Sequence, residues 1–146
     1  MQSVAHILRS KQSQTVFSIP PTALVLDAVK LLAEKHIGAL LVMEGEQIIG
    51  IVTERDLARK VDLLGRTSKD TRVRDIMTSN VMYVSPETTN EQCMALMTEN
   101  RLRHLPVMNN GKLVGLISIG DLVKDIISEQ QFIIQQLEHY IRGDRA

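Results

Sequence analysis

The feature that most constrains this chain is an internal repeat. Residues 16–57 align with residues 81–122 without a gap, at a constant spacing of 65 residues. The identical pairs include Pro21/Pro86, Leu31/Leu96, Val42/Val107, Gly50/Gly115, Asp56/Asp121 and Leu57/Leu122. Because a repeat of this length corresponds to one supersecondary unit, we expect both copies to adopt the same fold.

Each copy has the pattern of a β-α-β-β-α unit. Short apolar runs that end at proline, residues 16–19 and 81–84, predict strands. Apolar residues at helical spacing predict helices over residues 24–36 and 89–101. Two further apolar runs in each copy predict a hairpin, and a second helix follows directly. A three-stranded sheet is too small to stand alone, so the sequence predicts an α+β fold. In this fold two pseudosymmetric repeats pack sheet to sheet.

The repeat boundaries suggest a division of the chain into four parts. These are a first repeat with the N-terminal segment (1–62), a polar linker (63–72), a second repeat (73–127), and a C-terminal helix and tail (128–146). The C-terminal helix carries an apolar stripe from Ile126 to Ile141, and nothing else in so small a domain is obviously available to cover it.

Composition excludes several classes of protein. Seventeen basic and seventeen acidic residues cancel, which argues against a nucleic-acid-binding protein. No apolar run is long enough to span a bilayer, and the N-terminus lacks the pattern of a signal peptide, so we expect a cytoplasmic protein. The one cysteine, Cys93, cannot form an internal disulfide or a cysteine metal site. It aligns with Ala28, a small core position, which predicts an inert thiol.

A hydroxyl–x–x–Asp tetrad lies at the same place in each copy. Thr53 and Asp56 form the first tetrad, and Ser118 and Asp121 form the second. Each hydroxyl follows a predicted strand and each carboxylate lies one helical turn later. The free N–H groups of a helix start suit an anion such as phosphate, and the Asp can accept hydrogen bonds from a vicinal diol such as ribose. Gly120 would let a ligand approach the backbone closely.

The same tetrads have a purely structural interpretation. Ser/Thr-x-x-Asp is a near match to a capping box, which satisfies the start of a helix without any ligand. Duplication copies structural features as readily as functional ones. From the tetrads alone, capping is therefore favoured over ligand binding.

The surrounding motifs bear on this choice. They are h-x-x-I-M before each copy, proline after the first strand, the segment Leu105–Met108, and G-h-h-[ST]-x-x-D-h in both copies, where h is an apolar residue. In this order, and duplicated, they closely resemble a CBS domain pair, or Bateman module, over residues 4–127. The chain also looks like small stand-alone bacterial CBS-pair proteins. The resemblance implies adenosyl ligands between the two copies: AMP, ADP, ATP, S-adenosylmethionine or an NAD-type dinucleotide.

The resemblance also implies two sets of ligand contacts. In one site Asp121 would hold ribose, and Ser118 with the backbone near Gly120 would hold phosphate. Its adenine walls would be Val16, Phe17 and Ile37, with further phosphate contacts from Arg103 and His104. The mirror site would use Asp56, Thr53 and Arg55, with Val81, Tyr83 and Leu102 around the base.

The two predicted sites are not equivalent. The second copy has Arg103 and His104 where the first has Gly38 and Ala39, so the mirror site lacks a cationic clamp. We therefore expect the Asp121 site to bind phosphate-rich ligands more tightly. For His104 a structural alternative remains open, in which it is a hydrogen-bonded histidine at the edge of the module.

The sequence therefore predicts a regulatory module that senses AMP, ATP or NAD-type ligands, requires no metal and has no catalytic residues. Glu54-Arg55-Asp56 is a charge cluster, but no nucleophile or metal ligand accompanies it. We expect a homodimer that signals to an effector protein in trans, without nucleic-acid or membrane partners. The alternative is a structural adaptor whose tetrads serve only as helix caps.

Overall fold

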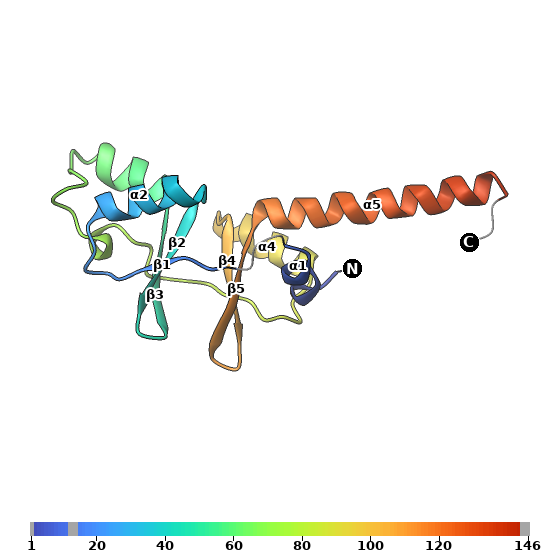
Figure 1. Cartoon of the computed structure of the whole chain (residues 1–146), viewed down its shortest axis with the longest axis horizontal. Helices are drawn as coiled ribbons and strands as arrows, with labels where there is room; N and C mark the ends of the chain where they lie inside the picture. The colour runs from blue at the N-terminus through green and yellow to red at the C-terminus, as the bar shows by residue number, and fades with distance from the viewer. Residues whose placement is uncertain (1, 12–14, 144–146) are drawn as a thin grey trace. The chain divides into compact units, whose positions relative to one another are not determined.

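The computed structural model describes residues 2–11 and 15–143, and the chain divides into two compact units. The first-repeat unit comprises residues 15–83. The second-repeat unit comprises residues 84–146 together with the N-terminal residues 1–14. Figure 1 labels the elements of both units.

The first-repeat unit is built on a three-stranded sheet in the order β1-β2-β3, with β1 parallel and β3 antiparallel to β2. Its elements are β1 (Ser18–Ile19), α2 (Val25–Lys35), β2 (Ala39–Glu44), β3 (Gln47–Thr53), α3 (Glu54–Leu57), the π-helical turn η1 (Ala58–Asp62) and the 3₁₀ turn η2 (Val73–Asp75). Buried aliphatic side chains from the sheet, α2, η1 and η2 form one core. Residues on one face of a helix and on alternating positions of strands thus bury the same apolar surface.

The linker between the repeats caps helix α2. Leu24, at the N-cap, makes no side-chain capping bond. Instead the backbone N–H of Val25 donates to the Thr71 carbonyl at 2.8 Å, and that of Leu26 donates to the Ser68 carbonyl at 3.0 Å. These bonds satisfy donors that a helix start leaves free. The polar linker therefore packs on the first-repeat unit through its backbone.

The second-repeat unit contains the corresponding hairpin and helices. One of its helices, α1, precedes the first repeat in the chain. Its elements are α1 (Val4–Ser10), α4 (Asn90–Asn100), β4 (His104–Asn109), β5 (Lys112–Ser118) and α5 (Ile119–Ile141). Asn110 and Gly111 have φ values of 52° and 78°, which is the turn that the Asn-Gly pair predicts. Helix α5 runs well past the other elements of its unit (Figure 1). No helix in the described ranges combines the length and apolar character needed to cross a bilayer.

The prediction of a strand at residues 81–84 is wrong in extent. Only Val84 pairs, through an isolated parallel bridge to Val107, so the second sheet has two strands. In the first repeat, the Leu41 N–H donates to the Phe17 carbonyl at 3.2 Å and extends the pairing of β1. The residue that corresponds to Leu41 is Pro106, which has no N–H to donate. The second repeat therefore has an extended segment at the same position but lacks the hydrogen bond that corresponds to the one between Leu41 and Phe17.

The short segments that precede each repeat dock in the same way. The Val4 N–H donates to the Thr88 carbonyl and the Ala5 N–H to the Pro86 carbonyl, at 2.8 and 2.9 Å. In the first-repeat unit, the N–H groups of Val73 and Arg74 donate to the carbonyls of Ala23 and Pro21, at 2.9 and 3.1 Å. Each segment thus contacts the repeat that it does not directly precede. The contacts group α1 with the second repeat, whereas sequence order groups it with the first.

Two repeat-related glycines allow these segments to approach the hairpins. A Cβ at Gly50 would lie 2.6 Å from Met77 Sδ and 3.1 Å from the Thr78 carbonyl oxygen. A Cβ at Gly115 would lie 2.7 Å from Leu8 Cδ2. Both glycines are buried, and the Thr78 oxygen at Gly50 belongs to the backbone and has little room to move, whereas the Leu8 methyl at Gly115 ends a flexible, half-buried side chain. The Gly50/Gly115 identity in the repeat is therefore explained by close packing.

The single cysteine is part of the core. Cys93 is buried in α4, and burial raises the pKa of its thiol to about 11. At neutral pH the thiol is protonated, and the reactive thiolate is scarce. The prediction that Cys93 is inert agrees with this environment.

We predict that Gly50→Ala lowers the free energy of unfolding by about 1–3 kcal/mol, because the added methyl overpacks against Met77 and the backbone oxygen of Thr78. Gly120→Ala is the matched control, since a Cβ there meets only Ser118 Oγ at an ordinary 3.6 Å. Urea unfolding measures both variants. A Gly50→Ala protein as stable as wild type would contradict the close-approach explanation.

Candidate functional site

Both tetrads lie where the second strand of a hairpin turns into a helix. Ser118 is the N-cap of α5 and Thr53 is the N-cap of α3, each in extended backbone geometry. The extended residue ends the strand, and its side chain caps the first turn that follows. The sequence pattern thus places a hydroxyl and a carboxylate together at each corner.

The second tetrad forms a complete capping box. The Ser118 N–H donates to Asp121 Oδ2 at 2.9 Å, and the Asp121 N–H donates to Ser118 Oγ at 3.2 Å. The capping interpretation of the sequence is therefore confirmed as a structural role. A carboxylate has more lone pairs than this one bond uses, so capping leaves Asp121 able to accept further hydrogen bonds.

The first tetrad forms the same box within a tighter set of contacts. The Thr53 N–H donates to Asp56 Oδ2 at 3.0 Å and the Asp56 N–H to Thr53 Oγ1 at 3.3 Å. The other carboxylate oxygen of Asp56 is 3.1 Å from Lys60 Nζ and accepts from Thr78 Oγ1 at 3.3 Å. The Asp56 side chain is only 10% exposed. Protein groups thus engage both oxygens of Asp56.

Asp121 is held by a different cation. Lys11 Nζ, at the end of α1, lies 2.9 Å from Asp121 Oδ2 and donates to the Leu116 carbonyl at 2.9 Å. The Asp121 side chain is 20% exposed, twice the value for Asp56. The Ser118 N–H and the Lys11 ammonium both contact Asp121 through Oδ2. Of the two carboxylates, Asp121 is therefore the more accessible to a ligand.

The helices that follow the two tetrads also differ. Helix α5 has 23 residues, whereas α3 has four residues before the chain passes into the π-helical turn η1. The partial positive charge at a helix start comes from aligned peptide dipoles and unpaired N–H groups. The start of α5 is consequently the better regular anion-binding position, which adds to the asymmetry between the tetrads.

The predicted phosphate contacts Arg103 and His104 lie beside the second tetrad. His104 pairs with Ser118 across the hairpin, and the Arg103 carbonyl accepts from the Ile119 N–H at 2.8 Å. The Arg103 side chain is exposed. Burial lowers the pKa of His104, while the Asp121 carboxylate opposes that shift. Among the described residues His104 Nδ1 has no hydrogen-bond partner, so its ring is not fully satisfied as the structural alternative supposed.

The remaining predicted residues are divided between the two units. Ser118, Gly120, Asp121, Arg103, His104 and Leu102 belong to the second-repeat unit, and Val16, Phe17, Ile37, Thr53, Arg55, Asp56, Val81 and Tyr83 belong to the first-repeat unit. Tyr83 is 63% exposed, and Val16, Phe17, Ile37, Val81 and Leu102 are half-buried. Their assignment to adenine stays a prediction.

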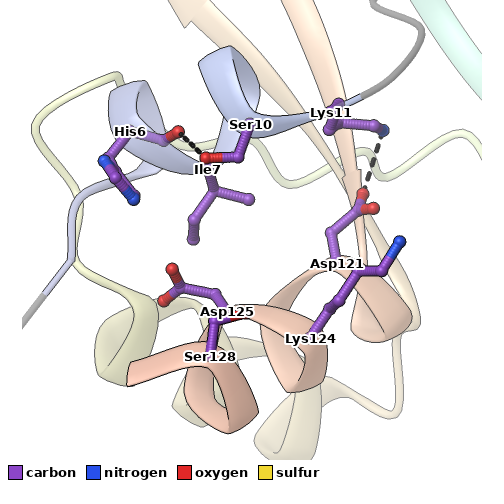
Figure 2. A pocket seen from close by; sticks show the side chains of 8 residues that line it. All are labelled: His6, Ile7, Ser10, Lys11, Asp121, Lys124, Asp125 and Ser128. Atoms are coloured by element: carbon purple, nitrogen blue, oxygen red, sulfur yellow. Dashed lines mark hydrogen bonds and ion pairs between the residues drawn. The ribbon is translucent and has the colours of Figure 1, made fainter. Parts of the chain in front are cut away.

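A cavity of about 350 Å³ opens between α1 and the first turns of α5, within the second-repeat unit. Figure 2 shows Asp121, Lys11 and Lys124 at one end of it, with Asp125 and His6 toward the other. Asp125 also accepts from Asn90 Nδ2 at 2.9 Å. The cavity thus joins the accessible carboxylate to a polar space with two ammonium groups.

Sequence reasoning missed three residues that contact the tetrad carboxylates: Lys11, Lys60 and Thr78. Lys60 had a detectable signal, because it lies four residues after Asp56 on the same helical segment. Lys11 had none, since it lies outside the aligned repeat. Within residues 2–11 and 15–143, no cluster of three or more His, Cys, Asp or Glu side chains could hold a metal ion.

Comparison with known proteins gives a family match over most of the chain. The model for the CBS domain matches twice, at residues 4–63 and 73–128. The mitochondrial CBS domain-containing protein CBSX3 of Arabidopsis thaliana is 45% identical over 124 residues. That match covers 82% of this chain and 60% of CBSX3. Two further Arabidopsis relatives are matched over only 21% and 22% of their lengths.

Solved structures share the fold. A protein with CBS domains from Burkholderia ambifaria MC40-6 is 57% identical, with a TM-score of 0.86, and the match covers 88% of this chain and 96% of that one. The CBS domain pair of protein MJ0100, solved with 5′-methylthioadenosine and S-adenosyl-L-methionine, has a TM-score of 0.75. It is 21% identical, with 88% and 98% of the two chains covered, which shows likeness of fold alone.

We predict that His104 makes the fold less stable in mild acid. A histidine whose pKa is lowered in the folded state is neutral there, so protonation favours the unfolded chain as the pH falls below the ordinary value of 6.5. His104→Gln should lose less stability than wild type between pH 7.5 and pH 5, measured by urea unfolding. His36→Asn, at an exposed helix end, is the control. A His104→Gln slope equal to that of wild type would refute the prediction.

Proposed function

The chain belongs to the CBS-domain family, and from that premise we propose that it is a non-enzymatic regulatory module that binds an adenosyl ligand at Asp121. The observation that carries the proposal is the accessible carboxylate at the start of the long helix α5, beside a polar cavity. A carboxylate in that position can accept both hydroxyls of a ribose. The N–H groups of Ile119 and Asp121 are already bonded within the unit, so the Gly120 N–H of the same helix start is the one that can face a phosphate.

The ligand class is supported by the family and by the local chemistry. The CBS pair of MJ0100 binds two adenosyl compounds, and this chain shares its fold. In the second-repeat unit Ser118, Arg103 and His104 lie next to the start of α5, and their side chains are of types that can donate to anionic oxygens. We propose AMP, ADP or ATP as the ligand, with an NAD-type dinucleotide as the variant that needs more space. The predicted adenine contacts from the other unit are part of this proposal.

The two tetrads should not be equal in this function. Asp56 is enclosed by Thr53, Thr78 and Lys60, whereas Asp121 is more exposed and borders a cavity. A ligand at Asp56 would have to replace bonds that the fold already makes to both oxygens. We propose that the Asp121 tetrad is the stronger binding site and that the Asp56 tetrad is mainly structural.

One observation favours the alternative of an adaptor without ligand. Both capping boxes are complete within the chain, so neither tetrad needs a ligand to satisfy its helix. An adaptor would use the same fold to dock a partner protein. Ligand binding, measured directly, separates the two functions.

We predict that AMP, ATP, NAD or S-adenosylmethionine raises the melting temperature of the purified protein. A ligand at a hundredfold excess over its Kd adds about 2.7 kcal/mol of stability, which is roughly 5–10 °C for a chain of this size. Asp121→Ala should abolish the shift. Asp56→Ala, the matched control, should keep the ligand-induced shift. Without ligand it should melt at a lower temperature than wild type, because its free energy of unfolding is lower by about 2–3 kcal/mol.

No shift with any of the four compounds would favour the adaptor. Equal loss of the ligand shift in Asp121→Ala and Asp56→Ala would refute the proposed inequality of the tetrads.

The exposed face of α5 supports the proposal of a homodimer. Ile127, Ile134 and Ile141 repeat at seven-residue spacing, and Ile133, Leu137 and Tyr140 lie beside them; all six side chains are 49–82% exposed. A seven-residue apolar repeat is the pattern of paired helices. In proteins most helical stability comes from packing of an apolar face rather than from intrinsic propensity. We propose that this stripe pairs with a second copy, and that the ligand signal passes to an effector protein in trans.

We predict that Ile134→Glu converts a dimer to a monomer, because it places a charge at the centre of the stripe. Light scattering during gel filtration measures the mass. Phe132→Glu is the control: Phe132 is 61% exposed but lies about 160° around the helix from Ile134, given roughly 100° per residue. A wild-type monomer, or an Ile134→Glu protein with unchanged mass, would contradict this assignment.

A further inference from the structure

Lys11 makes two contacts for which the first-repeat unit uses three separate groups. Its ammonium contacts Asp121 Oδ2 and the Leu116 carbonyl oxygen, both at 2.9 Å. At the position that corresponds to Leu116, the Ile51 carbonyl accepts from the Thr78 backbone N–H, also at 2.9 Å. At the position that corresponds to Asp121, Asp56 is contacted by Lys60 and by Thr78 Oγ1. One flexible side chain therefore replaces a backbone bond and two side-chain contacts.

Because of this replacement, a ligand can displace the Lys11 contacts of the second-repeat unit more easily than the Thr78 backbone bond of the first. The bond from Thr78 N to Ile51 is part of an antiparallel bridge and cannot break without moving the backbone. The ammonium of Lys11 lies at the end of a four-carbon side chain, so it can leave by rotation of side-chain bonds alone. Its side chain is 26% exposed, and it lines the cavity that also contains Asp121. The contact between Lys11 and Asp121 is thus the part of this corner that can open most easily.

A ribose that uses both carboxylate oxygens meets Lys11 directly. Asp121 Oδ2 already accepts from the Ser118 N–H, which the capping box requires, and from Lys11. A neutral diol would have to compete with an ammonium for the same oxygen, and a charge-assisted contact is the stronger of the two. Binding through the diol alone is therefore opposed by Lys11.

A phosphate on the same ligand reverses this effect. Figure 2 shows Lys11 and Lys124 close to Asp121, and the other carboxylate of the cavity, Asp125, lies toward the opposite end. An ammonium displaced from Asp121 therefore remains beside the position of the ligand and near a second ammonium. A phosphate there gives Lys11 a new anionic partner in exchange for the one that it leaves.

We propose that Lys11 is a displaceable occupant of the ribose carboxylate that selects phosphate-bearing adenosyl ligands over uncharged ones. This inference rests on the proposed binding of an adenosyl ligand at Asp121. It names the ligand class as a nucleotide, and it assigns specificity to a residue outside the repeat. Lys11 opposes adenosine by competition and supports AMP by direct attraction.

The test is calorimetric titration of the full chain with AMP and with adenosine. Lys11→Met should bind adenosine several-fold more tightly and AMP more weakly, so the ratio of the AMP and adenosine affinities should fall by about tenfold or more. Lys11→Gln, which can still donate to the Leu116 carbonyl, should show the same fall and guards against a folding defect in Lys11→Met. Lys11→Arg should keep the wild-type preference because it keeps the charge.

Lys112→Met controls for the loss of one positive charge, since Lys112 is exposed at the hairpin of the same unit and does not line the cavity. It should leave the ratio unchanged. A wild type that binds AMP, combined with Lys11 variants that weaken AMP and adenosine by the same factor, would overturn the role of Lys11 and leave the proposed function standing. A wild type that binds neither compound would overturn both.

Discussion

The Ser118 and Thr53 N–H groups each donate to a carboxylate three residues ahead, and each carboxylate residue donates its own N–H back to the hydroxyl. This reciprocal bond fixes the corner between the hairpin and the helix in both units. The direction of the helix, the position of the carboxylate and the contacts of the neighbouring segment all follow from it. Any ligand that binds at such a corner must use the hydrogen-bonding capacity that the cap leaves free on the hydroxyl and the carboxylate. Structure and function therefore share the same two side chains.

Much of the fold was predictable because its determinants are local and are copied. The helices expected over residues 24–36 and 89–101 are α2 and α4, with the outer residues acting as caps: His36 and Arg101, at aligned positions, both adopt the left-handed conformation that ends a helix. The Asn110-Gly111 turn was predictable for the same reason. The short first strand of the second repeat was not predictable in this way. The sequence shows that Pro106 has no N–H, but it does not show that this N–H would have bonded the first strand.

The grouping of segments could not be predicted from the repeat. The motif before each copy is similar, and the bonds made by Val4 and Val73 are equivalent. Sequence similarity therefore says that each segment docks on a repeat, but it does not say which one. The outcome matters for the candidate site, because the exchange brings α1, and with it Lys11, to the second tetrad. A residue outside the aligned repeat consequently becomes the main cationic contact of Asp121, and no periodicity or motif pointed to it.

Helix α5 carries both the candidate ribose carboxylate, in its first turn, and the exposed apolar stripe, in about its last four turns. The two features therefore lie toward opposite ends of one continuous helix. Twenty residues separate Asp121 from Ile141, about 30 Å along the axis, so a tilt of about 5° at the first turn moves the far end by roughly 2.6 Å. A shift of that size is enough to take an aliphatic side chain out of its van der Waals contacts. Exchange of a partner at the Asp121 carboxylate is thus mechanically connected to whatever packs on the distant end of the same helix.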